Sequence, residues 1–357
     1  MSNAIRVLIV DDSAFMRQTL RRMLDGKDSI QVVGTVANGR LAIAEAERLK
    51  PDVITLDIEM PEMDGLTALP RLLRVCQARI LMVSSLTVDG SHAALTAMRL
   101  GADDFLAKDQ SQISLNLGPL EDELLLKVRT LGRNNRHRTM RSITPSQSSA
   151  ASLKLSVSDY DVMLIGSSTG GPPVLETIIT SLPKSFPLPV VIAQHMPAMF
   201  TATMAERLDE TSELNVLHGQ PNLPVSKGHV YVAMGGQHTR LRRRAAGGYR
   251  LEVSPEPTNA PYRPSVNELF ASGAETFGKR VLAIVLTGMG DDGLVGAQLL
   301  REKGATILAQ DADSCVVYGM PKVVTQAGLV AANLNPSQFV QALKGLGTPS
   351  VRHGATA

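Results

Sequence analysis

The first 125 or so residues alternate short apolar runs with stretches whose apolar residues recur at helical spacing. The apolar runs predict strands at residues 5–10, 30–36, 53–56, 79–83 and 105–107. Amphipathic stretches connect them and predict helices, the second of which should end before Pro51. Regular strand–helix alternation predicts a parallel sheet with helices on both faces.

A second alternation of the same kind follows in the C-terminal half of the chain. Its apolar runs predict strands at residues 162–165, 190–194, 229–233, 281–286 and 306–309. Residues 240–253 contain two alternating segments around Gly247-Gly248, which predicts a β-hairpin. The fold class expected is therefore α/β, with two doubly wound parallel-sheet domains, the second of which carries a hairpin.

The segment between these patterns has no sustained apolar period and mixes arginines with Ser, Thr, Asn and Gln, which is typical of a linker. We therefore expect a first domain at residues 1–128, a linker at 129–158, a second domain at 159–348 and a tail at 349–357.

Composition narrows the class of protein. With 44% hydrophobic and 20% charged residues among 357, the chain has the make-up of a globular protein large enough for two domains. A net charge of +2 does not favour nucleic-acid binding. Cys76 and Cys315 fall in different halves, so we expect no structural disulfide. The N-terminus lacks a signal-peptide pattern, and no apolar run reaches the ~18 residues of a membrane span, so we expect a cytoplasmic protein without membrane insertion.

Five polar residues follow the predicted strands of the first domain, and these are Asp11, Asp12, Asp57, Ser84 and Lys108. Each aspartate alone could be a helix cap or a turn residue. Because the carboxyl ends of parallel strands share one edge of a sheet, the five together predict a site. Clustered carboxylates suit Mg²⁺. One carboxylate could then accept a phosphoryl group, while the metal and Lys108 neutralise charge and Ser84 binds phosphoryl oxygens.

The second domain offers a serine, a histidine and an aspartate in corresponding positions. Ser168 lies in the glycine-rich turn 166–171 between a strand and a helix, His195 follows the next strand, and Asp291 and Asp292 follow a third. A phosphate-binding loop would use a similar turn, but the lysine of a P-loop is missing. The histidine could be structural, and the aspartates could cap a helix. All three at one sheet edge would make a nucleophile, a general base and its orienting carboxylate.

The first domain resembles response-regulator receiver domains. The resemblance rests on Asp11-Asp12, Asp57, Pro61, Asp64-Gly65, Ser84, Phe105 and Lys108. It implies Asp57 as phosphoacceptor, Asp11, Asp12 and Asp57 as Mg²⁺ ligands, and Ser84, Lys108 and Phe105 as supporting residues. It also implies a flavodoxin-like fold and a chemotaxis histidine kinase as phosphodonor. Asp109 follows Lys108 where the family usually has proline.

Residues from about 160 to 346 resemble the catalytic domain of bacterial chemotaxis protein-glutamate methylesterases, which implies a Rossmann-like fold. The matching segments are 165–171, 194–197, Arg263-Pro264-Ser265-Val266, 286–293 and 314–321. The resemblance selects Ser168 as nucleophile rather than Ser167, where the family commonly has alanine. It selects His195 as base and Asp292 rather than Asp291 as orienter. Backbone N–H groups of Thr169, His195 and Met289 are the candidate oxyanion donors.

These resemblances imply an activity and its control. The expected reaction is hydrolysis of glutamate methyl esters, with glutamine deamidation as a second activity, on methyl-accepting chemotaxis receptors and without a cofactor for ester hydrolysis. We expect the unphosphorylated receiver to cover the catalytic edge and phosphorylation to open it. Two other classes remain open, an adaptor with a degenerate hydrolase site and a nucleotide-binding enzyme.

The arginines of the predicted hairpin form a basic strip at Arg240, Arg242, Arg243 and Arg244. Such a strip could meet an acidic partner, or it could be a solvated face.

Overall fold

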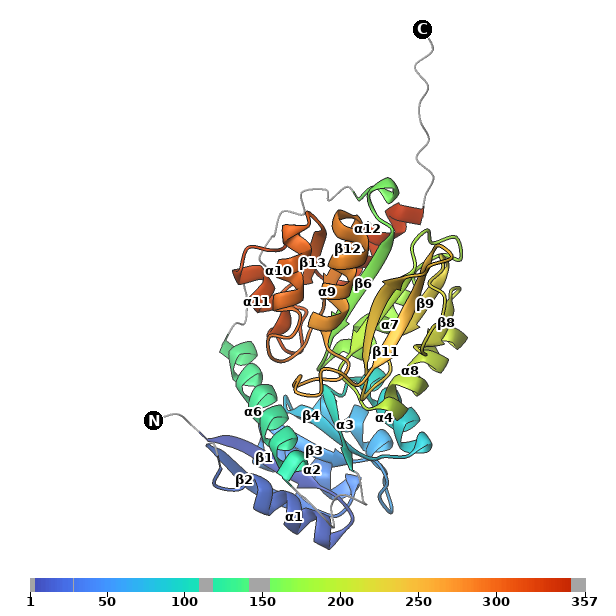
Figure 1. Cartoon of the computed structure of the whole chain (residues 1–357). Helices are drawn as coiled ribbons and strands as arrows, with labels where there is room; N and C mark the ends of the chain where they lie inside the picture. Colours follow the sequence, from blue (N-terminus) through green and yellow to red (C-terminus); the bar gives the residue numbers. More distant parts are fainter. Residues whose placement is uncertain (1–3, 28, 109–117, 141–154, 348–357) are drawn as a thin grey trace. The chain divides into compact units, whose positions relative to one another are not determined.

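The computed structural model describes residues 4–27, 29–108, 118–140 and 155–347, and for residues 134–140 it describes the backbone alone. The chain divides into two compact units, Met1–Gln147 and Ser148–Ala357. Each unit is built on a parallel sheet (Figure 1), which confirms the predicted fold class. The expected domain boundaries remain predictions, and helix α6 (Gly118–Met140) continues through the first residues assigned to the linker.

The first unit contains a five-stranded parallel sheet whose strand order reverses next to its first strand. In spatial order the strands are β2 (Ile30–Val36), β1 (Ile5–Val10), β3 (Val53–Asp57), β4 (Arg79–Ser85) and β5 (Asp104–Lys108). Nearly every position of β1, β3 and β4 is buried, and most of these residues are aliphatic, as expected for a sheet that is covered on both faces. The reversal between β1 and β3 leaves room for a ligand at their carboxyl ends.

The helices of the first unit begin at residues that the sequence marks as caps. They are α1 (Ala14–Leu24), α2 (Gly39–Leu49), α3 (Gly65–Val75), α4 (Val88–Leu100) and α6. The side chains of Ser13, Asn38, Asp64 and Thr87 each accept a hydrogen bond from a backbone N–H in the first turn of α1 to α4. These caps fix where the loops after the strands end.

The second unit contains a seven-stranded sheet in which every paired strand is parallel. In spatial order the strands are β14 (Ala332–Leu334), β13 (Thr306–Gln310), β12 (Val281–Val285), β6 (Val162–Ser167), β7 (Val190–Gln194), β9 (His229–Val232) and β8 (Asn215–His218). The central strands are fully buried, whereas β8 and β14 are short edge strands that the sequence pattern did not reveal.

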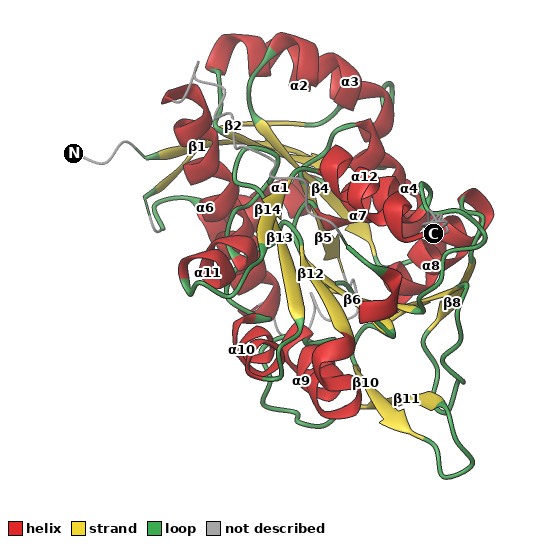
Figure 2. Ribbon diagram, turned by 90° about the horizontal axis from the view of Figure 1, so that it is seen from above, coloured by secondary structure: helices red, strands yellow, loops and turns green. Residues whose placement is uncertain are grey.

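Helices cover both faces of this second sheet. They are α7 (Gly171–Ile179), α8 (Ala198–Thr211), α9 (Val266–Phe277), α10 (Leu294–Glu302), α11 (Met320–Gln326) and α12 (Pro336–Gly347), with the 3₁₀ turns η1 (Val157–Asp159) and η2 (Gly278–Arg280). Figure 2 shows α9 and α10 together on one side of the strands, with α7 and α12 on the other. The core between α9 and the sheet is mostly aliphatic and includes the buried ring of Phe270.

The predicted hairpin is present and packs against α9. Its strands β10 (His238–Arg243) and β11 (Tyr249–Ser254) pair antiparallel. The backbone N–H of Leu241 donates to Ser272 Oγ at 3.0 Å, and Thr276 Oγ1 donates to the carbonyl of Leu241 at 3.0 Å. Hydrogen bonds thus join the hairpin to the C-terminal half of α9.

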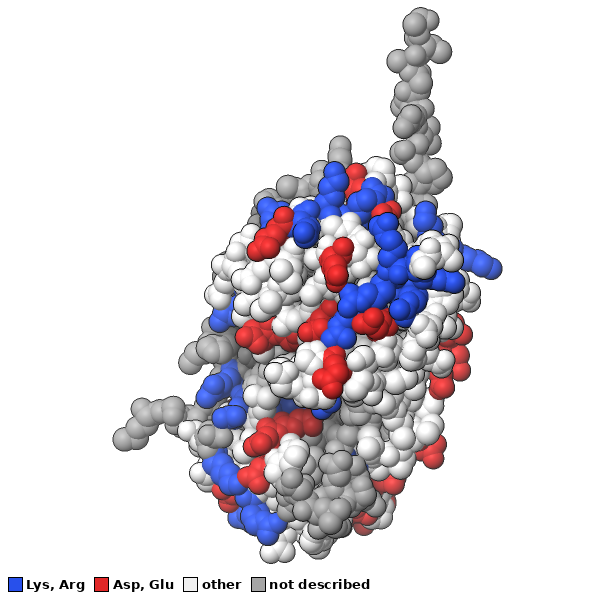
Figure 3. Space-filling model, in the orientation of Figure 1, with Lys and Arg blue, Asp and Glu red and all other residues white. Residues whose placement is uncertain are grey.

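The arginines of the hairpin are partly neutralised. Figure 3 shows Lys and Arg side chains interleaved with Asp and Glu on the visible face of the molecule. Arg240 pairs with Glu268 at 2.6 Å, and Arg242 pairs with Glu275 at 2.7 Å. Two of the four arginines of the expected strip therefore pair with α9, and a third, Arg243, lies over the ring of Tyr249. No helix in the described part of the chain is long and apolar enough to cross a membrane.

Candidate active site

The acidic residues of the first unit meet at the carboxyl edge of its sheet. Asp11 and Asp12 follow β1 and Asp57 ends β3, and one carboxylate oxygen from each lies within 4.8 Å of the others. They line a cavity of about 400 Å³ together with Lys108 at the end of β5. An all-oxygen set of this size and charge fits Mg²⁺, so these three residues would hold the ion.

Lys108 is the counter-charge of this cluster. Its Nζ lies 2.9 Å from Asp57 Oδ2 and 3.2 Å from Asp11 Oδ2. Burial nevertheless raises the pKa of Asp57 from its usual 3.8 to about 6, because it outweighs the opposing effect of Lys108 and is helped by the charge of Asp11. Both the unfavourable burial of this carboxylate and the excess of three carboxyl groups over one lysine favour a bound cation.

The two supporting residues of the first unit are buried. Ser84 lies in β4, and its Oγ donates to the carbonyl of Gly90 at 2.8 Å. The neighbouring Ser85 lines the cavity instead. Phe105 is 5% exposed, and Lys127 of α6 lies over its ring at 5.7 Å from the centroid. The roles expected for Ser84 and Phe105 therefore remain predictions.

In the second unit, Ser168 directly follows β6 in a tight turn before α7. Gly170 adopts a positive φ of 75°, which a glycine accommodates without strain, and Gly171 N–H donates to the Ser168 carbonyl at 2.8 Å. Gln194 Nε2 donates to the same carbonyl at 2.9 Å. The Ser168 N–H in turn donates to the carbonyl of Thr287 after β12. Contacts from the end of β7, the loop after β12 and the start of α7 thus fix the backbone of the serine.

His195 lies beside this serine because β6 and β7 pair in register, with Ser167 opposite Gln194. Its Nε2 is 2.8 Å from Asp292 Oδ2. The other ring nitrogen, Nδ1, is buried and has no hydrogen-bond partner among the described residues. A neutral imidazole that donates from Nε2 to the carboxylate leaves Nδ1 as a proton acceptor, as a general base requires.

Asp292 is held by more donors than any other carboxylate of the described sites. Besides His195, the Val266 N–H donates to Oδ2 at 2.6 Å. Oδ1 accepts hydrogen bonds from Ser265 Oγ at 2.9 Å and from the N–H groups of Asn267 at 3.0 Å and Gly293 at 3.1 Å. Burial acts to raise the pKa of Asp292, but the hydrogen bonds from His195 and these backbone groups outweigh it and lower the pKa. The start of α9 therefore keeps the carboxylate ionised.

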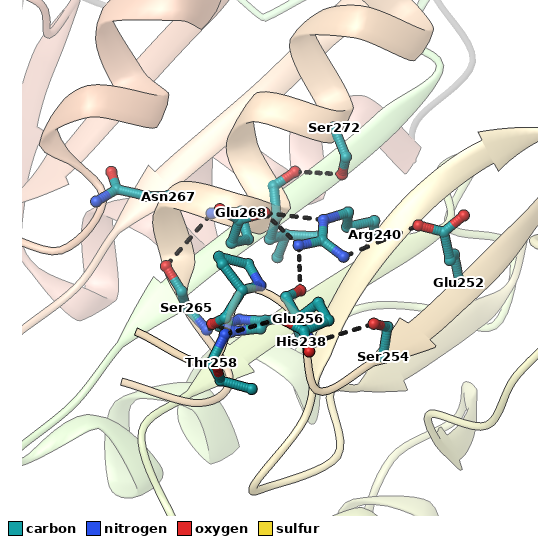
Figure 4. Close-up of polar contacts among 12 residues, drawn as sticks. His238, Arg240, Glu252, Ser254, Glu256, Thr258, Ser265, Asn267, Glu268 and Ser272 are labelled. Atoms are coloured by element: carbon teal, nitrogen blue, oxygen red, sulfur yellow. Dashed lines mark hydrogen bonds and ion pairs between the residues drawn. The ribbon is translucent and has the colours of Figure 1, made fainter. Parts of the chain in front are cut away.

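The segment that precedes α9 completes the surroundings of the pair. The ring of Tyr262 stacks on His195, with centroids 4.3 Å apart and planes at 6°. Figure 4 shows Ser265, at the start of α9, beside His238 of β10. The Ser265 N–H donates to His238 Nδ1 at 3.3 Å, and His238 Nε2 lies 3.2 Å from the Pro257 carbonyl. Burial lowers the pKa of His238, so it stays neutral and can accept from Ser265.

The three expected oxyanion donors do not share one environment. The backbone N–H of His195 donates to the Ser167 carbonyl at 3.1 Å, so we exclude it as an oxyanion donor in this conformation. The sequence could not show this sheet-like bond. Thr169 follows Ser168 directly, and Met289 follows Gly288, where an added methyl group would come within 2.8 Å of Ser168 Cβ. Thr169 and Met289 therefore remain candidates.

Comparison with known proteins assigns both units. Residues 163–343 match the CheB methylesterase family, and residues 7–116 match the response regulator receiver domain. The chain belongs to the CheB methylesterase family. It is an enzyme of that family, with a receiver domain at its N-terminus.

Relatives in this family align along most of the chain. The protein-glutamate methylesterase/protein-glutamine glutaminase 1 of Oleidesulfovibrio alaskensis is 42% identical over 95% of this chain and 98% of its own length. The Thermotoga maritima protein of the same activity name is 43% identical over 91% and 93%. The crystal structure of the Thermotoga maritima CheB methylesterase catalytic domain matches with a TM-score of 0.51 and 39% identity, covering 52% of this chain and 98% of that one.

Sequence reasoning missed three residues around the CheB-type site. Ser265 was part of a matching motif, but it received no role, and neither Tyr262 nor Gln194 was singled out. Gln194 preceded the histidine in a matching segment, so its position was visible. Its contact with Ser168 was not visible, because that contact depends on how the loop after β6 turns back over β7. Ser167 Oγ donates to Gln194 Oε1 at 2.6 Å and so fixes which end of the amide faces Ser168.

Proposed function

We propose that this chain hydrolyses glutamate γ-methyl esters, and deamidates glutamines, on methyl-accepting chemotaxis receptors. The observation that carries the proposal is the buried His195–Asp292 pair, in which the second imidazole nitrogen has no hydrogen-bond partner in the described part of the chain and His195 follows the strand that pairs with the strand before Ser168. Family membership supports the chemistry, because relatives that align along most of the chain bear this activity in their names. We propose a cytoplasmic location because the receptor glutamates in question are cytoplasmic.

In the proposed mechanism Ser168 Oγ attacks the ester carbonyl carbon and passes its proton to His195 Nδ1. Asp292 orients the ring and stabilises the imidazolium. The backbone N–H groups of Thr169 and Met289 bind the oxyanion. When the tetrahedral intermediate collapses, the C–O bond breaks and His195 returns the proton to the leaving methoxide, which departs as methanol.

Water then attacks the acyl-enzyme and gives its proton to His195. The carboxylate product leaves, and Ser168 recovers its hydrogen from the imidazolium. With glutamine the leaving group is ammonia, and every other step is the same. These steps need only side chains and backbone groups of the second unit.

We further propose that phosphorylation of Asp57 by a chemotaxis histidine kinase raises the esterase activity. Asp11, Asp12 and Asp57 would hold Mg²⁺, which when bound offsets the negative charge of the phosphoryl group. Lys108 would neutralise the same charge from the opposite side of the cavity. That the unphosphorylated receiver covers the catalytic edge stays a prediction.

The test is methanol release from methylated receptor membranes by the full chain. The wild type should release methanol, and Ser168→Ala should not. A small-molecule acyl phosphate with Mg²⁺ should increase the rate of the wild type and leave Asp57→Asn at its basal rate. A wild type that releases no methanol under either condition would favour the adaptor class, and an equal rate with and without phosphodonor would remove the regulatory proposal.

A further inference from the structure

Tyr262 lies where it can control the orientation of His195. Its ring is parallel to the imidazole at 6°, and 4.3 Å between centroids is close stacking contact. Among the described residues, Asp292 is the one hydrogen-bond partner of the imidazole, at Nε2. A single hydrogen bond does not by itself fix the rotation of the ring about the axis of that bond. A flat surface against one face removes this freedom.

The loop that carries Tyr262 is anchored to the rest of the site. The Arg263 carbonyl accepts a hydrogen bond from the Gly236 N–H at 3.0 Å, and the Ser265 N–H donates to His238 Nδ1 at 3.3 Å. Ser265 Oγ then donates to Asp292 Oδ1. The four residues 262–265 thus connect Tyr262, which stacks on His195, to Ser265, which donates to Asp292. The loop holds both members of the pair in one geometry.

The loop that carries Asp292 makes room for the aromatic ring. Gly290 has a positive φ of 81°, and a methyl group added there would come within 3.2 Å of Tyr262 Oη. The tyrosine therefore lies between the histidine and the loop from β12, half-buried rather than sealed in the core. A half-buried ring at this place could bind substrate, stabilise the fold or orient His195, and these three roles have different effects on kcat and KM.

We propose that Tyr262 is a positioning residue for the CheB-type reaction, acting by its stacked ring face on His195. The inference rests on the proposed function. Stacking fixes the plane of the imidazole and thereby the direction of Nδ1, and the aromatic face also attracts the imidazolium formed when Ser168 is deprotonated. Both effects act on the transition state more than on the bound substrate, so kcat rather than KM depends on the ring.

The experiment compares three variants of the full chain in methanol release from methylated receptor membranes. Tyr262→Leu removes the flat ring and should lower kcat about tenfold, on the scale of an aromatic pair, with KM within about twofold of wild type. Tyr262→Phe keeps the face and should restore kcat to within about twofold of wild type. Tyr249→Leu is the matched control, since Tyr249 contacts Phe277 at the far end of α9, and it should leave kcat unchanged.

A rise in KM without loss of kcat in Tyr262→Leu would mean that the ring contacts substrate, and it would overturn the proposal. Loss of kcat in Tyr262→Phe equal to that in Tyr262→Leu would assign the effect to the hydroxyl and overturn it as well. So would an unchanged kcat in Tyr262→Leu.

A second readout does not depend on the substrate. A stacked ring shields the carbon-bound protons of His195, so Tyr262→Leu should move their NMR resonances downfield while Tyr262→Phe leaves them in place. Unmoved resonances in Tyr262→Leu would overturn the stacking, whatever the activity. A wild type that shows the NMR effect but releases no methanol would instead refute the proposed function and leave the stacked geometry standing.

Discussion

Replacing Asp292 with asparagine exchanges one carboxylate oxygen for an NH₂ group at a position that is surrounded by hydrogen-bond donors. The carboxylate accepts two hydrogen bonds at Oδ2, from His195 and Val266, and three at Oδ1, from Ser265, Asn267 and Gly293. An amide nitrogen cannot accept a hydrogen bond, so each orientation of the new side chain sets NH₂ against donors.

The two orientations differ in what they leave unpaired. With NH₂ at the Oδ1 position, the new group faces the N–H groups of Asn267 and Gly293; Asn267 loses its acceptor, whereas the Gly293 N–H keeps Asn267 Oδ1 at 3.0 Å. With NH₂ at the Oδ2 position, Val266 N–H alone is orphaned, provided that His195 accepts at Nε2 and carries its proton on Nδ1. Each orientation therefore orphans one buried donor, at about 1–3 kcal/mol, and the second is preferred because its NH₂ opposes one N–H group rather than two.

That orientation blocks the base. A proton on Nδ1 leaves His195 unable to take the hydrogen of Ser168, as in other triads whose aspartate becomes asparagine. We expect kcat to fall about 10³- to 10⁴-fold, which corresponds to about 4–5.5 kcal/mol in the activation barrier. KM should change little, because Asp292 is 4% exposed and out of reach of substrate.

The assay is methanol release by the full chain, with Asp291→Asn as the matched control. Asp291 is the exposed neighbour of Asp292, and its change should leave kcat near wild type. Thermal unfolding should show a loss of about 2–4 °C for each kcal/mol in Asp292→Asn. Retention of more than about a tenth of wild-type kcat, or an equal loss in Asp291→Asn, would refute the reasoning.

Two predictions concern stability. In Mg²⁺-free buffer, Asp57→Asn should gain stability over wild type as pH rises. Because the pKa of Asp57 is raised in the folded state, its protonation adds to the free energy of unfolding of the wild type; this contribution is complete below the usual pKa of 3.8, is lost as pH rises through about 6, and amounts to about 3 kcal/mol. A difference between the two proteins in urea unfolding of the receiver that stays constant from pH 4 to 7.5 would contradict this. Gly166→Ala would place a methyl group 2.3 Å from Val266 Cγ1 and push the first turn of α9 away from Asp292. We expect the free energy of unfolding to fall by about 1–3 kcal/mol, with a lower Tm and a lower kcat. Gly345→Ala in α12, which meets nothing within 4 Å, is its control, and an equal Tm for the two variants would show that Gly166 is not constrained.

The sheets could be predicted because their central strands are buried on both faces and therefore appear as continuous apolar runs. The edge strands β8 and β14 could not, since they have four and three residues and half-exposed side chains that resemble loops. Parallel pairing also explains why the approach of His195 to Asp292 was expected, as each follows a strand of one sheet.

The other parts of the site depend on loop paths that no periodicity encodes. Tyr262 reaches His195 from a segment without regular structure, and Ser265 reaches Asp292 only because α9 begins beside the loop of β12. The engagement of the His195 N–H with Ser167 likewise follows from backbone direction rather than from residue type. Residue identities and strand order predict which side chains gather, whereas loop geometry decides which atoms face one another.

The hydrogen bonds between the hairpin and α9 have a consequence for how the enzyme would respond to heat. Leu241 is hydrogen-bonded to Ser272 and Thr276 in the C-terminal half of α9, and the first turn of the same helix supplies N–H groups that bind the carboxylate of Asp292. Partial fraying of the hairpin would loosen the helix start well before the seven-stranded sheet melts. Activity would then be lost at temperatures where the sheet is still folded, and the stability of the hairpin, rather than that of the sheet, would set the upper temperature limit of catalysis.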